Sequence, residues 1–305
     1  MTEAILIAGP TASGKSTAAL ALARALGGTV INADSMQVYR ELRVLTARPS
    51  SADLIAVPHR LYGTVPAREA YSVGRWLNDA ADAIAEANAQ GRVPILVGGT
   101  GLYFKALLEG LAPVPEIPSE TRDQWRRTAA VLAPEGLHRE LAYRDPAMAE
   151  RLTPSDPQRI VRALEVIDAT GVSLAEWQGT AGCPILNRDA TLRLVIAPER
   201  EAVYAATEAR FDTMIEEGAL AEVKALVALH LDEGLPLMRA HGVHELSAHL
   251  AGALSLEDAV AKAKTETRRY AKRQMTWLKR FMADWEWLPN GSGAVSVADR
   301  AVLKR

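Results

Sequence analysis

The chain has 305 residues, of which 49% are hydrophobic and 24% are charged, and its formal net charge is −2. This is an ordinary globular composition, and the length allows one large domain or two modest ones around a well-buried core. The single cysteine, Cys183, excludes an internal disulfide, and no stretch is long enough to span a bilayer or to act as a signal peptide, so we expect a cytoplasmic protein without a membrane partner.

The first expected element is an apolar strand at Ala4–Ala8, which runs into a glycine-rich loop and then a helix at Ser16–Leu26. The loop sequence GPTASGKS matches the pattern G-x-x-x-x-G-K-S/T. Glycines let backbone N–H groups turn toward an anion, the helix N-terminus adds its positive dipole end, and the lysine adds a cation. A ligand-free glycine turn is disfavoured because motif and context agree. We predict that a di- or triphosphate is bound, with Mg²⁺ on the Ser16 hydroxyl, by Gly9, Pro10, Thr11, Ala12, Ser13, Gly14, Lys15 and Ser16.

Further strands and helices alternate along the first part of the chain. Short apolar runs predict strands at Thr29–Asn32, Val93–Val97 and Thr191–Ala197. Helical patterns lie at Val73–Asn88 and Leu102–Leu108. This alternation predicts an α/β fold with a parallel sheet of the P-loop NTPase type, which gathers ligands at the carboxyl ends of its strands.

The alternation stops near Pro113, in the proline-rich segment LAPVPEIPSE. From Ser119 to about Gly171 the pattern is helical, with Ser155 or Asp156 as a candidate cap for a helix whose first turn contains Pro157. A looser stretch over 172–189 follows. We therefore predict a helical insertion domain at 116–193, within a core formed by 1–115 and 194–305.

After the last predicted strand the pattern is helical again, at Glu201–Leu229, Ser255–Lys264 and Thr265–Met282, and the end of the chain, 290–305, is expected to be weakly ordered. Seven lysines and arginines between Lys264 and Arg280 are opposed only by Glu266. Such density favours contact with a polyanion over a merely solvated helix face. A stripe at helical spacing is expected to face the core and consists of Tyr270, Gln274, Trp277 and Phe281.

The residues that follow the predicted strands Thr29–Asn32 and Val93–Val97 help to distinguish which phosphate chemistry the protein performs. Asp34 follows the strand Thr29–Asn32 and could be a metal ligand, a general base or a helix cap. The strand VPILVGG instead runs into glycines and Thr100, without the second metal-binding acid that an NTPase normally carries there. The phosphate loop alone therefore leaves a kinase, an NTPase and a rarer chemistry open.

The motifs GPTASGKS, NADSMQVYR, TARP, VGGTGLYFKAL, DPQRIVRALEV and YAKRQMTWLKR occur in an order and at spacings that resemble the tRNA dimethylallyltransferase family. The resemblance covers the chain to about Trp287. It implies transfer of a dimethylallyl group from dimethylallyl diphosphate to the exocyclic amine of the adenosine beside the anticodon, position 37 of the tRNA. It also implies that the helical insertion grips the anticodon stem-loop.

The resemblance further implies individual roles. Asp34 would be the base, Thr100 would lie beside the reacting groups, and Arg210 would meet the diphosphate. Side-chain amides suit adenine edges, which makes Gln37 a candidate reader of an extruded base. The expected tRNA contacts are Asp34, Ser35, Met36, Gln37, Thr100, Arg122, Gln158, Arg159, Ile160, Val161, Arg162, Lys272, Arg273 and Gln274. PHRLYG and GVHEL depart from the family pattern, and no chemistry is assigned to His59, His241 or His244.

Two alternatives remain at the level of the sequence. One is a P-loop small-molecule kinase in which Asp34 serves a hydroxyl acceptor and ATP is the donor. The other is a non-catalytic RNA-binding protein that retains a phosphate loop. Prenyl transfer is preferred because an isoprenoid diphosphate needs a cradle, a divalent cation and basic groups, but no γ-phosphate machinery. We expect a monomer, since nothing in the pattern demands a partner chain.

Overall fold

The computed structural model describes residues 3–294 and 296, and the chain divides into two compact units. Unit 1 consists of residues 1–108 and 185–305, and unit 2 consists of residues 109–184. The segment expected to be inserted, 116–193, therefore differs from unit 2 by several residues at each end. Pro184 closes unit 2, so the looser stretch that precedes the fourth predicted strand is shared between the units.

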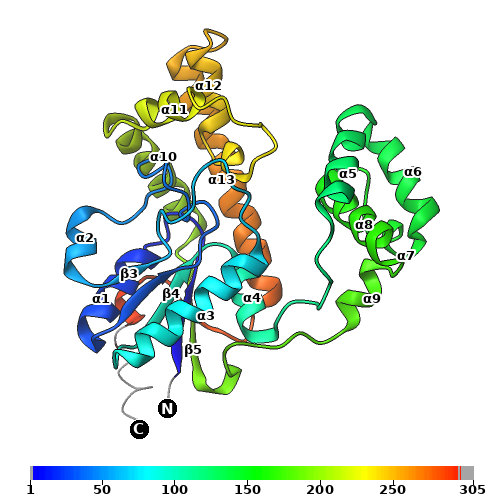
Figure 1. Cartoon of the computed structure of the whole chain (residues 1–305). Helices are drawn as coiled ribbons and strands as arrows, with labels where there is room; N and C mark the ends of the chain where they lie inside the picture. Colours follow the sequence, from blue (N-terminus) through cyan, green and yellow to red (C-terminus); the bar gives the residue numbers. More distant parts are fainter. Residues whose placement is uncertain (1–2, 295, 297–305) are drawn as a thin grey trace. The chain divides into compact units, whose positions relative to one another are not determined.

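Within the described residues, six strands of unit 1 form one sheet in the order β3-β2-β4-β1-β5-β6, and all neighbouring strands are parallel (Figure 1). The strands are β1 (Ala4–Ala8), β2 (Thr29–Asn32), β3 (His59–Arg60), β4 (Pro94–Gly98), β5 (Thr191–Ile196) and β6 (Glu286–Leu288). Every residue of β1, β2 and β4 is buried, as expected for inner strands of a sheet covered on both faces. The α/β fold and the four predicted strands are confirmed. The edge strands β3 and β6 were missed because each is only two or three residues long.

The helices of unit 1 are α1 (Lys15–Leu26), α2 (Ser51–Ala56), α3 (Val73–Ala89), α4 (Gly101–Glu109), α10 (Arg200–Glu216), α11 (Ala219–Val227), α12 (Val243–Leu250) and α13 (Leu256–Phe281), with short 3₁₀ helices at Arg188–Ala190 and Pro236–Arg239. The last residue of α4 belongs to unit 2. Leu22 on α1 belongs to the same buried cluster as Ile5, Ile95 and Leu194 of the strands, so this helix covers one face of the sheet. The helices α10, α11, α12 and α13 cluster together in Figure 1, coloured olive to orange.

Two predicted helix boundaries in unit 1 are wrong. The segment expected to be one helix, 201–229, is divided into α10 and α11 by Gly218, whose φ of 101° is not helical. The segments expected at 255–264 and 265–282 form the single helix α13. The Thr265 hydroxyl donates a hydrogen bond to the Ala261 carbonyl at 3.0 Å, so this residue is accommodated inside the helix instead of ending it.

The predicted core stripe on α13 is also incorrect in part. The buried face of this helix is lined by Ala259, Ala263, Thr267, Ala271, Gln274 and Leu278. Of the stripe residues only Gln274 is buried, and Phe281 is 38% exposed. Small residues let α13 approach its neighbours closely, while Trp277 and Phe281 pack against each other with ring centroids 4.6 Å apart.

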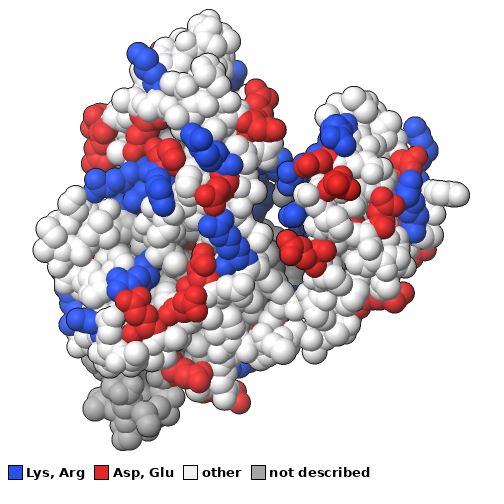
Figure 2. Space-filling view, viewed as in Figure 1, with Lys and Arg blue, Asp and Glu red and all other residues white. Residues whose placement is uncertain are grey.

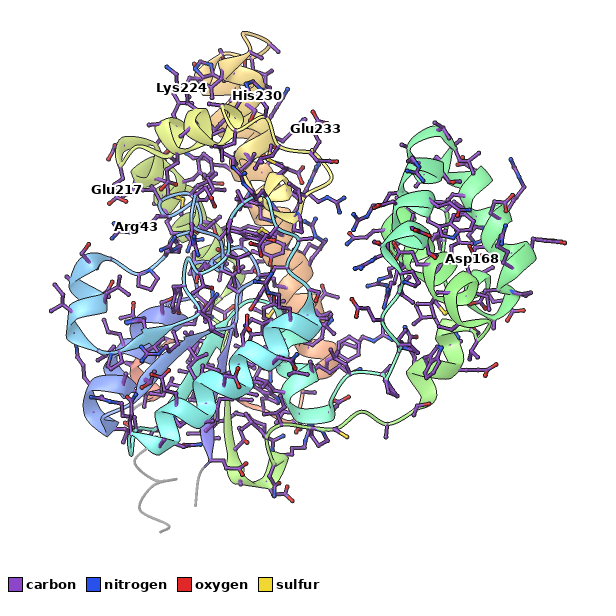
Figure 3. The ribbon with its side chains drawn as sticks, viewed as in Figure 1. Arg43, Asp168, Glu217, Lys224, His230 and Glu233 are labelled. Carbon is purple, nitrogen blue, oxygen red and sulfur yellow. The ribbon has the colours of Figure 1, made fainter. Side chains whose placement is uncertain are left out.

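Unit 2 is a helical body formed by α5 (Ser119–Val131), α6 (Pro134–Arg144), α7 (Pro146–Ala149), α8 (Pro157–Thr170) and α9 (Leu174–Gly179). Its core contains Trp125, Leu141 and Leu164. Asp156 caps α8 and Pro157 lies in its first turn, as predicted. Asp168, labelled in Figure 3, accepts hydrogen bonds from the Trp125 indole at 3.2 Å and from the Arg144 guanidinium at 2.8 Å. These bonds tie α5 and α6 to α8.

The expectation of weak order near the C-terminus concerns residues that lie mostly outside the described part, which lacks 295 and 297–305. Before this gap, Ala294 is fully buried against the sheet core. None of the described helices combines the length and apolar character that crossing a membrane would require.

Candidate functional site

The phosphate loop follows β1 and leads directly into α1, as the sequence predicts. The Ala18 amide donates to the Gly14 carbonyl at 3.1 Å and so begins the helix. Lys15, the first helical residue, folds its ammonium back onto the Pro10 carbonyl at 3.1 Å. The buried Ser13 hydroxyl has no hydrogen-bond partner within the described residues. A buried hydroxyl without a partner, in a loop of this sequence, leaves bonding capacity for a ligand.

A second cation reaches the loop from a distant part of the chain. Arg210 on α10 donates a hydrogen bond from Nη2 to the Thr11 hydroxyl. Burial lowers the pKa of Arg210, although the negative charge of Asp34 opposes this effect. Burial also lowers the pKa of Lys15 to about 8, with Asp34 acting against the shift and Arg210 adding to it. The three charges therefore share one site, as expected for residues that bind and release an anion.

Asp34 is held in a tight turn after β2. One of its carboxylate oxygens accepts a hydrogen bond from the Met36 amide at 3.0 Å. The fully buried Asn32 fixes the backbone on both sides of this residue, since its amide oxygen accepts from Asp34 N and its amide nitrogen donates to Asp34 O, each at 2.9 Å. Asp34 thus caps a turn and not a helix, which leaves its second oxygen for metal or proton chemistry.

Thr100 joins the loops that follow β2 and β4. Its hydroxyl accepts a hydrogen bond from the Ser35 amide at 3.0 Å, and its own amide donates to the Ala33 carbonyl at 3.2 Å. Because β2 and β4 are neighbours in the sheet, these loops leave the same edge. The predicted residues Asp34, Ser35 and Thr100 are therefore brought together.

Three tyrosines surround this part of the site. Burial and the Asp34 charge raise the pKa of Tyr62, Tyr103 and Tyr270, so their phenols remain protonated at neutral pH. Tyr270 also lies against His241, with ring centroids 4.4 Å apart. The resulting surroundings of Asp34 combine aromatic surface with phenolic hydrogen-bond donors.

The strands that flank β1 carry no acid at their carboxyl ends. The strand β4 runs into Gly98 and Gly99, and β5 runs into Ala197. Within the described ranges no group of three or more histidines, cysteines, aspartates or glutamates could hold a metal ion. A metal bound here would therefore have few protein ligands, such as the hydroxyl of the exposed Ser16 at the start of α1, and would depend largely on oxygens of the bound substrate.

Gln37 is directed into its own loop. Its amide nitrogen donates to the carbonyls of Thr46 and Ala47, at 2.8 and 3.0 Å. The same loop is held from α11 by Glu222, whose carboxylate accepts hydrogen bonds from the backbone amides of Arg43, Val44 and Leu45 at 2.8 to 3.1 Å. Figure 3 labels Arg43 on this loop and Lys224 on α11. The segment after Asp34 is thus fixed by side chains from both sides.

The expected RNA residues of unit 2 lie near the start of α5 and on the first turns of α8. Arg159 and Arg162 are exposed, and each lies within 3.4 Å of an acid on its own helix, Asp156 and Glu165 respectively. Arg122 is half-buried, Gln158 is exposed and Val161 is half-buried. Ile160 is completely buried in the core of unit 2, where its side chain packs and does not reach solvent.

Part of the positive charge of the basic cluster on α13 is neutralised by ion pairs that the sequence does not indicate. Lys264 pairs with Asp212, and Arg268 pairs with Glu208, both from α10. Lys272 and Arg273 are exposed and, among the residues that the structure describes, have no carboxylate partner. On the face shown in Figure 2, basic and acidic side chains of unit 1 are interspersed. Any attraction of a polyanion to α13 therefore depends on these local cations.

Gln274 is buried, unlike the exposed residues Lys272 and Arg273 that precede it on α13. It is 6% exposed, and both ends of its amide are bonded to the glycine-rich loops of the site. Sequence reasoning missed this role, together with those of Asn32 and Glu222. Gln274 and Glu222 carry no local signal, because each bonds to backbone groups that are remote in the sequence. Asn32 does carry one, since an asparagine commonly bonds to the backbone two residues further on, as it does here at Asp34.

The phosphate loop follows the inner strand β1, two cations lie at this loop, and the Asp34 carboxylate follows β2 at the same edge of the parallel sheet. This arrangement defines a P-loop protein with a site suited to a phosphorylated substrate. The sequence model of the family described as IPP transferase matches residues 37–281, and that described as isopentenyl transferase matches residues 2–67. The chain belongs to the tRNA dimethylallyltransferase (IPP transferase) family.

Similar proteins cover nearly the whole chain. The tRNA dimethylallyltransferase of Azorhizobium caulinodans is 53% identical over 282 residues, which are 92% of this chain and 90% of that protein. A tRNA dimethylallyltransferase of a Bradyrhizobium species is 54% identical over 286 residues, or 94% of each chain.

Solved structures agree with this relationship. The tRNA isopentenylpyrophosphate transferase of Bacillus halodurans superposes with a TM-score of 0.67 at 33% identity, covering 94% of this chain and 90% of that one. A eukaryotic dimethylallyltransferase acting on tRNA superposes with a TM-score of 0.82 at 27% identity, covering 98% of this chain and 77% of that one.

Proposed function

We propose that this protein transfers the dimethylallyl group of dimethylallyl diphosphate to the exocyclic amine of the adenosine at position 37 of tRNA, beside the anticodon. The observation that carries the proposal is the convergence of Lys15, Arg210 and Asp34 at the carboxyl edge of the sheet. Two cations suit the diphosphate, and one carboxylate suits the amine. Family membership supports the same activity.

The diphosphate is held by the phosphate loop. Backbone amides at the start of α1, the Lys15 ammonium and the Arg210 guanidinium are the groups that receive the negative charge of the leaving group. In the transfer step the amine nitrogen bonds to C1 of the dimethylallyl group. The C1–O bond breaks, and its electron pair leaves with the diphosphate.

Asp34 accepts the proton that the amine loses. An aromatic amine is a weak nucleophile, so a positioned base contributes directly to the rate. The Met36 amide occupies one carboxylate oxygen and fixes the rotamer, which leaves the other oxygen for the proton. Thr100 holds the adjoining loop through the Ser35 amide and thereby helps to fix the position of Asp34.

Mg²⁺ is proposed as the metal that accompanies the diphosphate. The donor set fits, because Ser16 offers a hard oxygen at the helix N-terminus and Mg²⁺ commonly takes few protein ligands beside phosphate oxygens. When bound, the ion would neutralise diphosphate charge.

The RNA is proposed to contact cations of both units. Arg159 and Arg162 on α8, Arg122 on α5, and Lys272 and Arg273 on α13 would contact phosphates or bases, with Ser35, Met36 and Gln37 near the extruded adenine. Phosphate contacts of this kind set affinity and its dependence on salt. Cytoplasmic localisation and a monomeric state remain predictions.

Separate calorimetric titrations with dimethylallyl diphosphate and with ATP test the proposal. We expect the diphosphate to bind in the presence of Mg²⁺ and labelled dimethylallyl groups to pass to unmodified tRNA. Tight binding of ATP without binding of the diphosphate would favour the kinase alternative and contradict this proposal. Diphosphate-independent RNA binding with no label transfer would favour a non-catalytic RNA-binding protein.

A further inference from the structure

Gln274 lies between the two glycine-rich loops of the site. Its Oε1 accepts a hydrogen bond from the Thr11 amide at 2.9 Å, and its Nε2 donates to the Gly99 carbonyl at 3.0 Å. The partners fix the orientation of the amide, because a backbone N–H only donates and a carbonyl only accepts. One buried side chain thus connects the phosphate loop to the loop that carries Thr100.

The fit around this amide is close. A Cβ atom added at Gly99 would lie 2.2 Å from Gln274 Nε2, so a larger residue at this position would have to displace the Gln274 amide. Gln274 comes from the buried face of α13, a helix of 26 residues, which gives the connection a rigid support. Both polar ends are satisfied, and a satisfied buried polar group specifies one arrangement of its partners.

The connected residues are those to which the reaction is assigned. Thr11 also accepts the hydrogen bond of Arg210, and the residue after Gly99 is Thr100, whose hydroxyl holds the Ser35 amide. A continuous series of bonds therefore runs from the diphosphate-binding arginine to the loop of the catalytic carboxylate. Gln274 occupies its centre, directly after the exposed residues Lys272 and Arg273.

We infer that Gln274 is a positioning residue, which sets the separation of the diphosphate cradle and the acceptor loop, and not a direct contact to RNA. The inference rests on the proposed prenyl transfer. Correct separation matters because the amine and C1 must approach in line, and a misplacement of about 1 Å costs on the order of 100-fold in rate. Removing the amide should therefore reduce turnover more than it reduces the binding of either substrate.

The first test is Gln274→Met, which retains length and apolar volume but loses the hydrogen bonds to Thr11 and Gly99 together with the polar interaction with the Tyr270 phenol. We expect kcat to fall about 10- to 100-fold, while the Kd for tRNA stays within about twofold of the wild-type value. The control is Thr267→Val, on the same buried face, because among the described residues the Thr267 hydroxyl bonds only to the Ala263 carbonyl of its own helix. A wild-type kcat for Gln274→Met would overturn the inference. Weaker tRNA binding with unchanged kcat at saturating tRNA would instead assign Gln274 to the RNA surface and overturn it as well.

The second test is Gln274→Glu, which remains informative if the Met variant does not fold. A protonated carboxyl group reproduces the amide, accepting from Thr11 and donating to Gly99, whereas a carboxylate faces the Gly99 carbonyl without a proton. The kcat of this variant relative to the wild type should therefore rise as pH falls, measured well below the Tm of both proteins. If the kcat of Gln274→Glu relative to the wild type stayed constant or decreased as pH was lowered, the inference would be overturned.

Measuring the binding of inorganic diphosphate tests the role of Gln274 independently of the proposed prenyl transfer. If the wild-type protein labels no tRNA, the prenyl transfer proposal fails by itself. The positioning role would still predict that Gln274→Met weakens binding of inorganic diphosphate by about threefold or more, because Thr11 loses its anchor, and that Thr267→Val does not. If the wild type, Gln274→Met and Thr267→Val bound inorganic diphosphate equally well, the proposed role of Gln274 in holding the phosphate loop would be contradicted, whether or not the protein transfers a prenyl group.

Discussion

The Thr100 hydroxyl accepts a hydrogen bond from the Ser35 amide at 3.0 Å and lies 3.3 Å from the Ser35 hydroxyl, so the residue after Asp34 is held by the loop that follows β4. The amide of Thr100 in turn donates to the Ala33 carbonyl. Asp34 is therefore enclosed between two residues that are both fixed by one threonine.

This relationship predicts the effect of removing the hydroxyl. Thr100→Val retains the shape of the side chain but leaves the Ser35 amide without its acceptor, which costs about 1–3 kcal/mol if the amide stays buried. We expect kcat to fall about 10-fold or more, and Thr100→Ser to retain most of the activity because it keeps the acceptor. Steady-state kinetics with both variants check this, and equal activity of the Val and Ser variants would show that the hydroxyl does not hold the loop.

Lys15 predicts a characteristic pH dependence of diphosphate binding. Burial lowers the pKa of its ammonium to about 8 in the free protein, so the cation is present below pH 8 and is lost as pH rises through that value. The protonated form binds the anion, and the association constant should therefore be insensitive to this group below pH 7 and fall by up to about tenfold per pH unit above 8.

The matched variant for this prediction is Lys15→Arg, because an arginine stays charged across the whole range. Calorimetric titration with dimethylallyl diphosphate between pH 6.5 and about 9.5 compares the two proteins. An equally steep loss of affinity in both would assign the transition to another group.

Glu222 predicts a local change in stability. Its carboxylate accepts hydrogen bonds from three consecutive backbone amides of the loop that also receives the Gln37 side chain. In Glu222→Gln the side chain loses its charge and one acceptor oxygen, so the free energy of unfolding should fall by about 1–3 kcal/mol.

Hydrogen exchange measures the effect of this substitution at the loop. We expect faster exchange of the amides of Arg43, Val44 and Leu45 in Glu222→Gln. The control is Glu217→Gln, an exposed position labelled in Figure 3 that follows α10. Unchanged exchange in the first variant would mean that the loop is ordered by other contacts.

The exposed cations of α13 predict a change in the salt dependence of tRNA binding. Replacing Lys272 and Arg273 by Gln should lower the slope of log K against log salt by about one for each phosphate contact that is lost. The control is Lys224→Gln, a lysine on α11 labelled in Figure 3. Filter-binding titrations over a range of salt concentrations give the slopes, and an unchanged slope in the double variant would remove α13 from the RNA interface.

The sequence was sufficient for the parts of the fold and site that depend on local patterns. Buried apolar strands and the glycine-rich loop gave β1, β2, β4, β5 and the phosphate-binding segment with boundaries correct to about one residue. Asp34 and Thr100 were each predicted to follow a strand of the parallel sheet, and the family resemblance implied that Thr100 lies beside the reacting groups.

Long-range side-chain contacts could not be predicted in the same way. The helical pattern of α13 placed Gln274 on the stripe expected to face the core, but the bonds of Gln274 span 263 and 175 residues, and no local pattern indicates these partners. The neutralisation of Lys264 and Arg268 likewise depends on acids from α10, which become neighbours only after the helices pack. Helix boundaries failed at Gly218, where a residue compatible with a helix pattern adopts a non-helical φ.

The most direct test of the proposed reaction is mass spectrometry of an unmodified tRNA after incubation with the protein, dimethylallyl diphosphate and Mg²⁺, with Asp34→Asn in parallel. The account predicts one added five-carbon unit on the adenosine beside the anticodon with the wild-type protein, and a rate about 100- to 10,000-fold lower with the variant, whose diphosphate binding is retained. An unmodified tRNA, a five-carbon unit at another position, or equal rates for the two proteins would contradict it.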